Sequence, residues 1–279
     1  MKLFGLKNKH FKPIFLKNKG FFHNTVKRMN EKKMNNVSQQ LNFLGMAYYQ
    51  SSKHIFQKGF NQLAKSEVIR TNLMEERMVD WEEVLEEIER GKKELMERNQ
   101  HLLKDENSKG HLLMSALILS WFRILNKYGV EQMKIMHLLK FCTSEQINVV
   151  NMLLTPVEVA IKFNQDPLPI LKKEIEIFSD AVLGESFEME FQHQPNTYMI
   201  VNFNKCFFNK FFRENDCAFL TQVFCAADNK FSTLADPKKH GIDVQIPFKL
   251  STDHSFCQFR FMRKQFNQEK DKSLVDSII

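Results

Sequence analysis

Two cysteines near the C-terminal end of the chain stand close in sequence to acidic or imidazole side chains. Cys225 precedes Asp228 by three positions, and Cys257 follows the pair Asp253-His254 by three positions. Cys, His and Asp together support three kinds of structure: a thiolate nucleophile with its base, a metal site, or a set of inert buried thiols. The functional interpretation of the chain depends on which of these three it forms.

A catalytic thiolate needs a neighbouring cation or helix N-terminus that lowers its pKa. His254 is the nearest candidate in sequence to Cys257, and Asp228 or Asp253 could orient its ring. Cys225 is the other candidate nucleophile, because it lies about one turn from Asp228 on a predicted helix and the two side chains can share a face. Spacing alone leaves the choice between the two cysteines open.

Two further residues are candidates for substrate binding. Cys206 lies upstream in the same region, and Arg260 follows Cys257 closely. Lys205 or Arg260 could supply positive charge to an acidic substrate, but on a regular strand Arg260 and Cys257 point to opposite faces. We therefore rank Arg260 below the other candidates.

A metal site would draw on Cys206, Cys225, Cys257 and His254, which have the right chemistry. These residues lack the Cys-x-x-Cys pairing of recognisable zinc sites, so the sequence leaves metal binding open. The alternative without a functional role is that each cysteine is a small core residue on a Phe-rich sheet face. We expect no cofactor, because the sequence holds no glycine-rich phosphate loop, no Gly-x-Ser-x-Gly and no His-Glu-x-x-His.

The elements that must position these residues have an α+β pattern, with helices first and an antiparallel sheet later. At Gly184 the hydrophobic period changes from that of a helix to that of a strand. We predict an N-terminal helical layer followed by a four-stranded antiparallel sheet with two inserted short helices. The strands are expected near 187–192, 197–203, 243–250 and 255–262, and the inserted helices near 204–213 and 216–226.

The helical layer has recognisable starts and stops. Asp80 is expected to cap a helix, with Glu83 completing a capping box. Residues 105–110 form a polar break before a helix over 111–128 that is apolar nearly all round, which indicates burial. Shorter helices are expected over 130–141 and 170–183.

Charge divides the chain into an arm and a body. Residues 1–36 hold ten Lys or Arg and one acid, whereas the remainder carries 30 basic and 32 acidic side chains. A body near neutrality argues against nucleic-acid binding. We divide the chain into a basic arm, a helical region, an α/β region that carries the candidate site and a polar tail, over 1–36, 37–183, 184–264 and 265–279.

The arm interleaves Lys with Phe, which is compatible with weak contact to an anionic membrane surface or an acidic partner. The alternative is a solvated leader without a partner, because the apolar positions keep no single helical face. No secretory signal or membrane span is recognisable, so we expect a cytoplasmic protein with reduced thiols. The odd count of five Cys also argues against a complete disulfide framework. Abundant Phe, Lys and Asn indicate an AT-rich, bacterial-like coding sequence, and nothing indicates an oligomeric state.

Three runs, over 206–211, 224–228 and 257–261, together resemble the family of L-2-amino-thiazoline-4-carboxylic acid hydrolases. The helix–Gly–helix stretch over 116–132 is also similar, so the resemblance extends over roughly 110–263. The family pattern prefers Gly near 253–254, where this chain has Asp and His. This departure bears on the substrate more than on the fold.

The resemblance implies a small-molecule substrate, a cyclic amidine that is hydrolysed at a carbon–nitrogen bond. Under this hypothesis Cys257 or Cys225 attacks the amidine carbon, and Asp228 or His254 moves protons. The alternative function is a non-catalytic small-molecule-binding or membrane-surface interaction protein, with residues 1–36 as its tether. Function carried over from a family resemblance needs its own test, because one fold hosts many activities.

Overall fold

The computed structural model describes residues 80–146, 157–158, 166–194, 197–234, 237–252 and 254–263. The predicted basic arm, the first part of the helical region and the polar tail lie outside the described residues. Asp253 lies outside them as well. No helix in the described ranges is both long enough and apolar enough to cross a bilayer.

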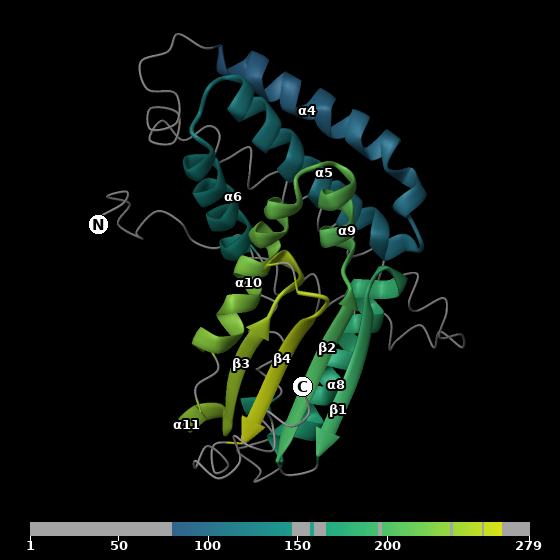
Figure 1. Cartoon of the computed structure of the whole chain (residues 1–279), viewed down its shortest axis with the longest axis vertical. Helices are drawn as coiled ribbons and strands as arrows, with labels where there is room; N and C mark the ends of the chain where they lie inside the picture. The colour runs from purple at the N-terminus through teal and green to yellow at the C-terminus, as the bar shows by residue number, and fades with distance from the viewer. Residues whose placement is uncertain are drawn as a thin grey trace, which may run out of the picture.

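The helices over 81–146 occupy one end of the molecule, the four-stranded sheet and the helix over 167–178 occupy the other, and the helices over 207–214 and 221–234 lie between them (Figure 1). This arrangement confirms the predicted α+β fold with a helical region ahead of an antiparallel sheet. The helices are α4 Trp81–Arg98, α5 Glu106–Lys127, α6 Gln132–Gln146, α8 Pro167–Phe178, α9 Phe207–Glu214, α10 Thr221–Leu234 and α11 Pro237–His240. The strands are β1 Glu188–Gln194, β2 Tyr198–Lys205, β3 Ile242–Phe248 and β4 Cys257–Arg263.

Helix α4 begins where the sequence predicts. The Asp80 carboxylate accepts a hydrogen bond from the Glu82 N–H at 3.0 Å, which satisfies one of the free donors of the first turn. The reciprocal capping box is found at α5 instead. There the Asp105 carboxylate accepts a hydrogen bond from the Ser108 N–H, and the Ser108 hydroxyl accepts one from the Asp105 N–H. The predicted break over 105–110 is therefore wrong, because this box starts α5 at Glu106, five residues earlier than apolar periodicity indicates.

Gly184 ends the turn of π-helix that follows α8, η3 (Ser179–Leu183). Its φ of 64° lies in the left-handed region, which favours glycine. A Cβ at this position would meet the Asp105 carboxylate at 2.0 Å. The chain therefore turns from the helical region into β1 at a site that excludes a side chain.

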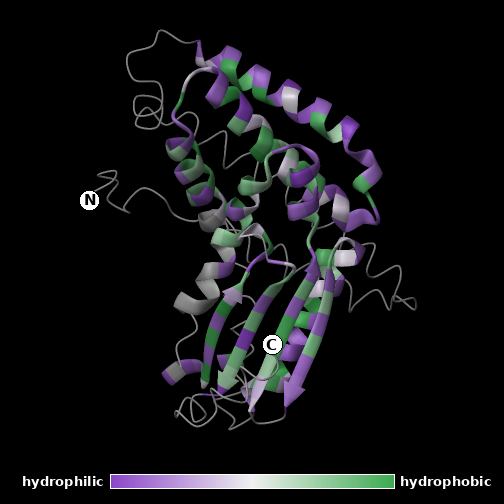
Figure 2. Cartoon of the chain, viewed as in Figure 1, coloured by the Kyte–Doolittle hydropathy of each residue, from purple (hydrophilic) through white to green (hydrophobic). Residues whose placement is uncertain are grey.

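The sheet has the strand order β1-β2-β4-β3, with every neighbouring pair antiparallel. The predicted hairpin of β1 and β2 is confirmed, and β4 pairs with the other side of β2. Hydrophilic and hydrophobic residues alternate along the strands (Figure 2). The apolar side chains on one face pack against α8, with Leu171 and Val201 among the fully buried residues.

A second core joins α4, α5 and α6 to α9 and α10. Helix α5 is buried on nearly all sides, as its composition predicts. Helix α10 ends at Leu234, so the second inserted helix extends beyond its predicted end near residue 226. Helices α9 and α10 lie between the two cores and carry residues that the sequence singles out for function.

Candidate active site of thiols and a carboxylate

Three cysteines and one aspartate from three parts of the sequence lie close enough to interact electrostatically. The Cys225 thiol interacts with Asp228, Cys206 and Cys257, and Cys206 also interacts with Cys257 and Asp228. We call Cys206, Cys225, Asp228 and Cys257 the thiol–carboxylate cluster. The fold therefore brings together four of the six residues that the sequence proposes for a site.

Strand register and helix spacing explain this convergence. Cys206 follows the last residue of β2 and precedes the first residue of α9. Cys257 begins β4 and pairs with Phe203 near that same end of β2. Cys225 and Asp228 are three residues apart within α10, so they share one face of the helix, as predicted.

Cys257 is buried and receives a hydrogen bond from the main chain. The Leu250 N–H donates to its Sγ at 3.1 Å, from the short η6 turn (Leu250–Thr252) that connects β3 to β4. Burial, with a smaller contribution from the Asp228 charge, raises the pKa of the Cys257 thiol to about 11, while the Leu250 N–H and the nearby Lys249 ammonium act in the opposite direction. The same contacts would favour the thiolate once a proton is removed.

Cys206 precedes α9 with an extended backbone, so its thiol faces the free N–H groups of the first turn. Burial raises the pKa of this thiol to about 12, and the main chain at Asn209 and Phe208 opposes the shift. No side-chain hydrogen bond of capping geometry forms at Cys206 within the described chain. The helix end therefore polarises this thiol weakly, and the thiol remains protonated at neutral pH.

The Cys225 thiol has a strongly raised pKa. Burial is the main cause, the Asp228 charge adds to it, and the Ser251 hydroxyl opposes it. Ser251 Oγ is itself buried and makes no hydrogen bond of standard geometry with any described residue. Its contact with Cys225 is therefore weak, and this thiol is harder to ionise than the Cys257 thiol.

Among the titratable groups of the cluster, Asp228 has the pKa nearest to pH 7. Burial raises the pKa of its carboxyl to about 6, and the charge of Lys249 opposes the shift. A carboxylate with such a pKa can both accept and return a proton near pH 7. Asp228 is therefore the member of the cluster suited to proton transfer.

His254 and Arg260 lie away from the cluster. His254 is exposed, and its ring contacts Phe248 with centroids 5.1 Å apart. Arg260 points to the other face of β4, where its Nε donates to Gln258 Oε1 at 2.5 Å and its guanidinium lies over the Phe248 ring. The groups that shift the pKa values of the thiols include neither residue.

The remaining sequence candidates are placed elsewhere. Lys205 is exposed and forms an ion pair with Glu188 on β1. Cys217 lies beside Arg123, and Cys142 is buried in α6. In the part of the chain that the structure describes, no three His, Cys, Asp or Glu side chains are arranged so that they could hold a metal ion.

The connection between β3 and β4 supplies functional groups that the sequence analysis missed. Lys249, Leu250 and Ser251 each act on a member of the cluster, through a charge, a main-chain N–H and a hydroxyl. The chain has 40 Lys and Arg, so residue type alone does not single out Lys249. Only its position shortly before Cys257 in the sequence could have pointed to it.

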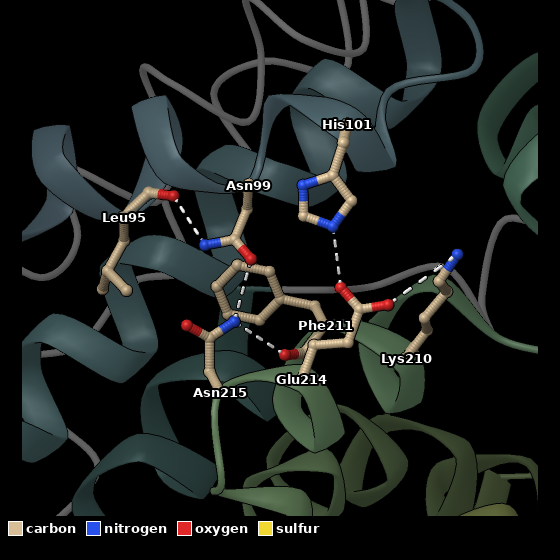
Figure 3. Close-up of polar contacts among 7 residues, drawn as sticks. All are labelled: Leu95, Asn99, His101, Lys210, Phe211, Glu214 and Asn215. Carbon is tan, nitrogen blue, oxygen red and sulfur yellow. Dashed lines mark hydrogen bonds and ion pairs between the residues drawn. The ribbon is translucent and has the colours of Figure 1, made fainter.

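Polar contacts tie α9 to the end of α4 (Figure 3). The Asn215 side-chain amide donates to Asn99 Oδ1 at 3.0 Å and to the Phe211 carbonyl at 2.9 Å. Asn99 in turn donates to the Leu95 carbonyl at 2.8 Å. Both amides are buried, so folding removes their hydrogen bonds to water, and these internal hydrogen bonds take their place.

A second link lies beside this amide pair. His101 Nε2 and Glu214 Oε2 are 2.9 Å apart, and Lys210 Nζ lies 3.9 Å from the other carboxylate oxygen (Figure 3). The three side chains are largely exposed, so their contribution to stability is small. The helical region thus holds the end of α9 that is opposite to Cys206.

The comparison with known families agrees with the position of the cluster. Residues 157–261 match the family described as L-2-amino-thiazoline-4-carboxylic acid hydrolase. The match confirms the resemblance for the C-terminal part of the chain, covers less than half of the chain and contains all four cluster residues. The stretch over 116–132, whose pattern is also similar to this family, lies outside the match. No curated protein matches the chain.

Proposed function

We propose that the chain is a hydrolase that opens a small cyclic amidine at a carbon–nitrogen bond, with the thiol–carboxylate cluster as its active site. The observation that carries the proposal is the convergence of Cys257, Cys225 and Asp228, which supplies nucleophile candidates and a proton acceptor in one place. The family match supports a hydrolase of this kind. His254 and Arg260 have no part in the proposed chemistry.

Cys257 is the preferred nucleophile over Cys225. Its thiol has the Leu250 N–H as a donor and Lys249 as a nearby cation, and both stabilise the thiolate. The Cys225 thiol has only the weak contact with Ser251 against the adjacent Asp228 charge. Loss of a proton is therefore less costly at Cys257.

In the first step the Asp228 carboxylate takes the Cys257 proton while Sγ attacks the amidine carbon. A bond forms between Sγ and that carbon, and the electrons of the carbon–nitrogen double bond move to the ring nitrogen. Asp228 then returns the proton to this nitrogen, and the ring carbon–nitrogen bond breaks. The leaving nitrogen takes a second proton from the other amidine nitrogen, so this step yields a free amine on the opened substrate and a neutral thioimidate bound to Sγ.

In the second step water adds to the thioimidate carbon, and Asp228 passes a proton from the water to the thioimidate nitrogen. The Sγ–carbon bond then breaks, the sulfur leaves with the proton of the new hydroxyl group, and the former amidine carbon keeps the oxygen as a carbonyl. The overall change is the addition of one water molecule across the ring carbon–nitrogen bond. The positive charge of Lys249 at the cluster favours a substrate that carries a carboxylate.

The proposed reaction needs reduced thiols. All five cysteines are free in the structure, and we propose that the protein works in the cytoplasm, where thiols are kept reduced. Contact of residues 1–36 with an anionic membrane surface remains a separate proposal. Vesicle co-sedimentation of the full chain and of a variant that lacks the arm tests it, and no binding by the full chain would remove it.

The experiment that tests the function is turnover of a panel of five-membered cyclic amidines, with and without a ring carboxylate, followed by mass spectrometry. We expect one water to be added to at least one carboxylate-bearing member, and the Asp228→Asn variant to lose this activity. A folded protein that binds a panel member and leaves it unchanged would contradict the proposal and favour the non-catalytic binding function.

A further inference from the structure

Asn209 is the residue that joins the first turn of α9 to the connection that carries Leu250. It is the third residue of α9 and its side chain is buried, with 8% of its surface exposed. Its Nδ2 donates to the Leu250 carbonyl oxygen at 3.3 Å. This side chain has no role in the reaction proposed above.

The orientation of the Asn209 amide follows from its two partners. Arg213 Nε donates to Asn209 Oδ1 at 3.1 Å, and an arginine side chain can only donate. The Leu250 carbonyl can only accept, so it must face the amide nitrogen. The hydrogen-bond network therefore leaves one arrangement, with the donor of Asn209 directed at the turn next to Cys257.

Leu250 is held from two sides. Its carbonyl accepts from Asn209, and its N–H donates to Cys257 Sγ at 3.1 Å. The turn around it is closed by the Thr252 N–H, which donates to the Lys249 carbonyl at 3.0 Å. A shift of this turn would move the Leu250 N–H and the Lys249 charge away from the Cys257 thiol together.

We propose that Asn209 is a positioning residue that holds the Leu250 N–H on Cys257 Sγ and thereby keeps this thiol reactive. Asn209 donates to the Leu250 carbonyl and has no step of its own in the proposed reaction, so its effect on Cys257 is exerted through Leu250. The inference rests on the proposed function only in taking Cys257 as the nucleophile. Its consequence for thiol reactivity can be measured without any substrate.

The test is the rate at which iodoacetamide alkylates Cys257 in the full chain, followed for its peptide by mass spectrometry from neutral to alkaline pH. In Asn209→Leu we expect Cys257 to react about tenfold more slowly near pH 8, because loss of the N–H donor raises the pKa of the thiol by about one unit. The pH at which the rate is half-maximal should rise by the same amount.

The matched control is Arg213→Met, which removes the other hydrogen bond of the Asn209 side chain and leaves the contact with Leu250. We expect unchanged alkylation of Cys257 in this variant. A merely structural role of Asn209 makes the opposite prediction, because looser packing around a buried thiol accelerates its alkylation. Alkylation in Asn209→Leu that equals or exceeds the wild-type rate would therefore overturn the proposal.

If Asn209→Leu does not fold, Asn209→Ser allows the same comparison, because serine is too short to reach the Leu250 carbonyl. The measurement also separates this inference from the proposed function. Slower alkylation in a protein that turns over no cyclic amidine would retain the role of Asn209 and reject the hydrolase. Turnover of a cyclic amidine together with unchanged alkylation in Asn209→Leu would support the hydrolase and reject the role of Asn209.

Discussion

The ring of Phe208 lies flat on the ring of Phe224, with centroids 3.7 Å apart and planes 7° from parallel. Phe208 is the second residue of α9, two positions after Cys206, and Phe224 precedes Cys225 on α10. The stacked pair thus joins the two helices beside two members of the thiol–carboxylate cluster. This aromatic contact sets the spacing of the two helices at this point in the described structure.

Truncation of this stack should be costly. We expect Phe224→Ala to lower the free energy of unfolding by about 3–5 kcal/mol, because it removes a buried ring and leaves a cavity. Urea denaturation measures the change. Phe219→Ala is the control, since Phe219 is 40% exposed and should cost clearly less. Equal costs for the two variants would show that the stack does not hold the helices together.

The raised pKa of Asp228 predicts a conflict between activity and stability. The folded-state pKa of about 6 exceeds the value of about 3.9 for an unfolded chain, so the folded state binds more protons between these values. Stability from this group is therefore present at low pH and is lost as the pH rises through about 6. Asp228→Asn should raise the free energy of unfolding at pH 8, by up to about 3 kcal/mol.

The same substitution should remove activity, because proton transfer contributes about 10²–10⁴-fold in rate. In the wild type, kcat/KM should rise with pH around 6 as Asp228 becomes the carboxylate that accepts the thiol proton. Asp216→Asn is the control, because this aspartate is exposed and asparagine tolerates its positive φ. Full activity of Asp228→Asn, or lower stability at pH 8, would argue against a buried proton acceptor.

His111 predicts a pH dependence of the opposite sign. Burial lowers the pKa of its ring to about 4, in a site enclosed by Phe187, Phe207 and Phe208, while its Nε2 lies 3.1 Å from the Leu183 carbonyl oxygen. The unfolded chain binds the proton first as the pH falls. Stability from this group is therefore complete above about 6.5 and declines as the pH falls towards 4.

The size of the loss can be checked with His111→Gln, which keeps a side-chain donor but does not titrate. Between about pH 6.5 and 4 the wild type should lose up to about 3 kcal/mol more than this variant. Comparing the two proteins cancels the contribution of Asp228 in the same range. Identical pH profiles would mean that the ring is hydrated in the folded protein.

The sequence predicts the sheet well because its signal is local. Phe187, Met189 and Phe191 alternate with polar residues, and only one face of β1 can then be buried. The start of α5 is predicted poorly because its first turn is polar. There the decisive contact is the reciprocal pair of Asp105 and Ser108, which apolar periodicity does not register.

The sequence predicts the residue types of the candidate site, but it does not predict which of these residues come together in the fold. Cys225 and Asp228 are paired by helix spacing, which the sequence shows directly. Their meeting with Cys206 and Cys257 depends on the order of the strands, which no local pattern encodes. Sequence proximity makes His254 one of two candidates for moving protons, beside Asp228, whereas the structure places the exposed ring of His254 against Phe248.

The most direct test of the central claim is kcat/KM of Cys257→Ser on 2-amino-thiazoline-4-carboxylate, compared with the wild type and with Cys217→Ser. Both substitutions replace one sulfur by oxygen, but only Cys257 belongs to the thiol–carboxylate cluster. We expect Cys257→Ser to lose more than about 10³-fold in kcat/KM and Cys217→Ser to retain wild-type activity. Wild-type activity in Cys257→Ser, with the same fold and the same substrate, would contradict the account.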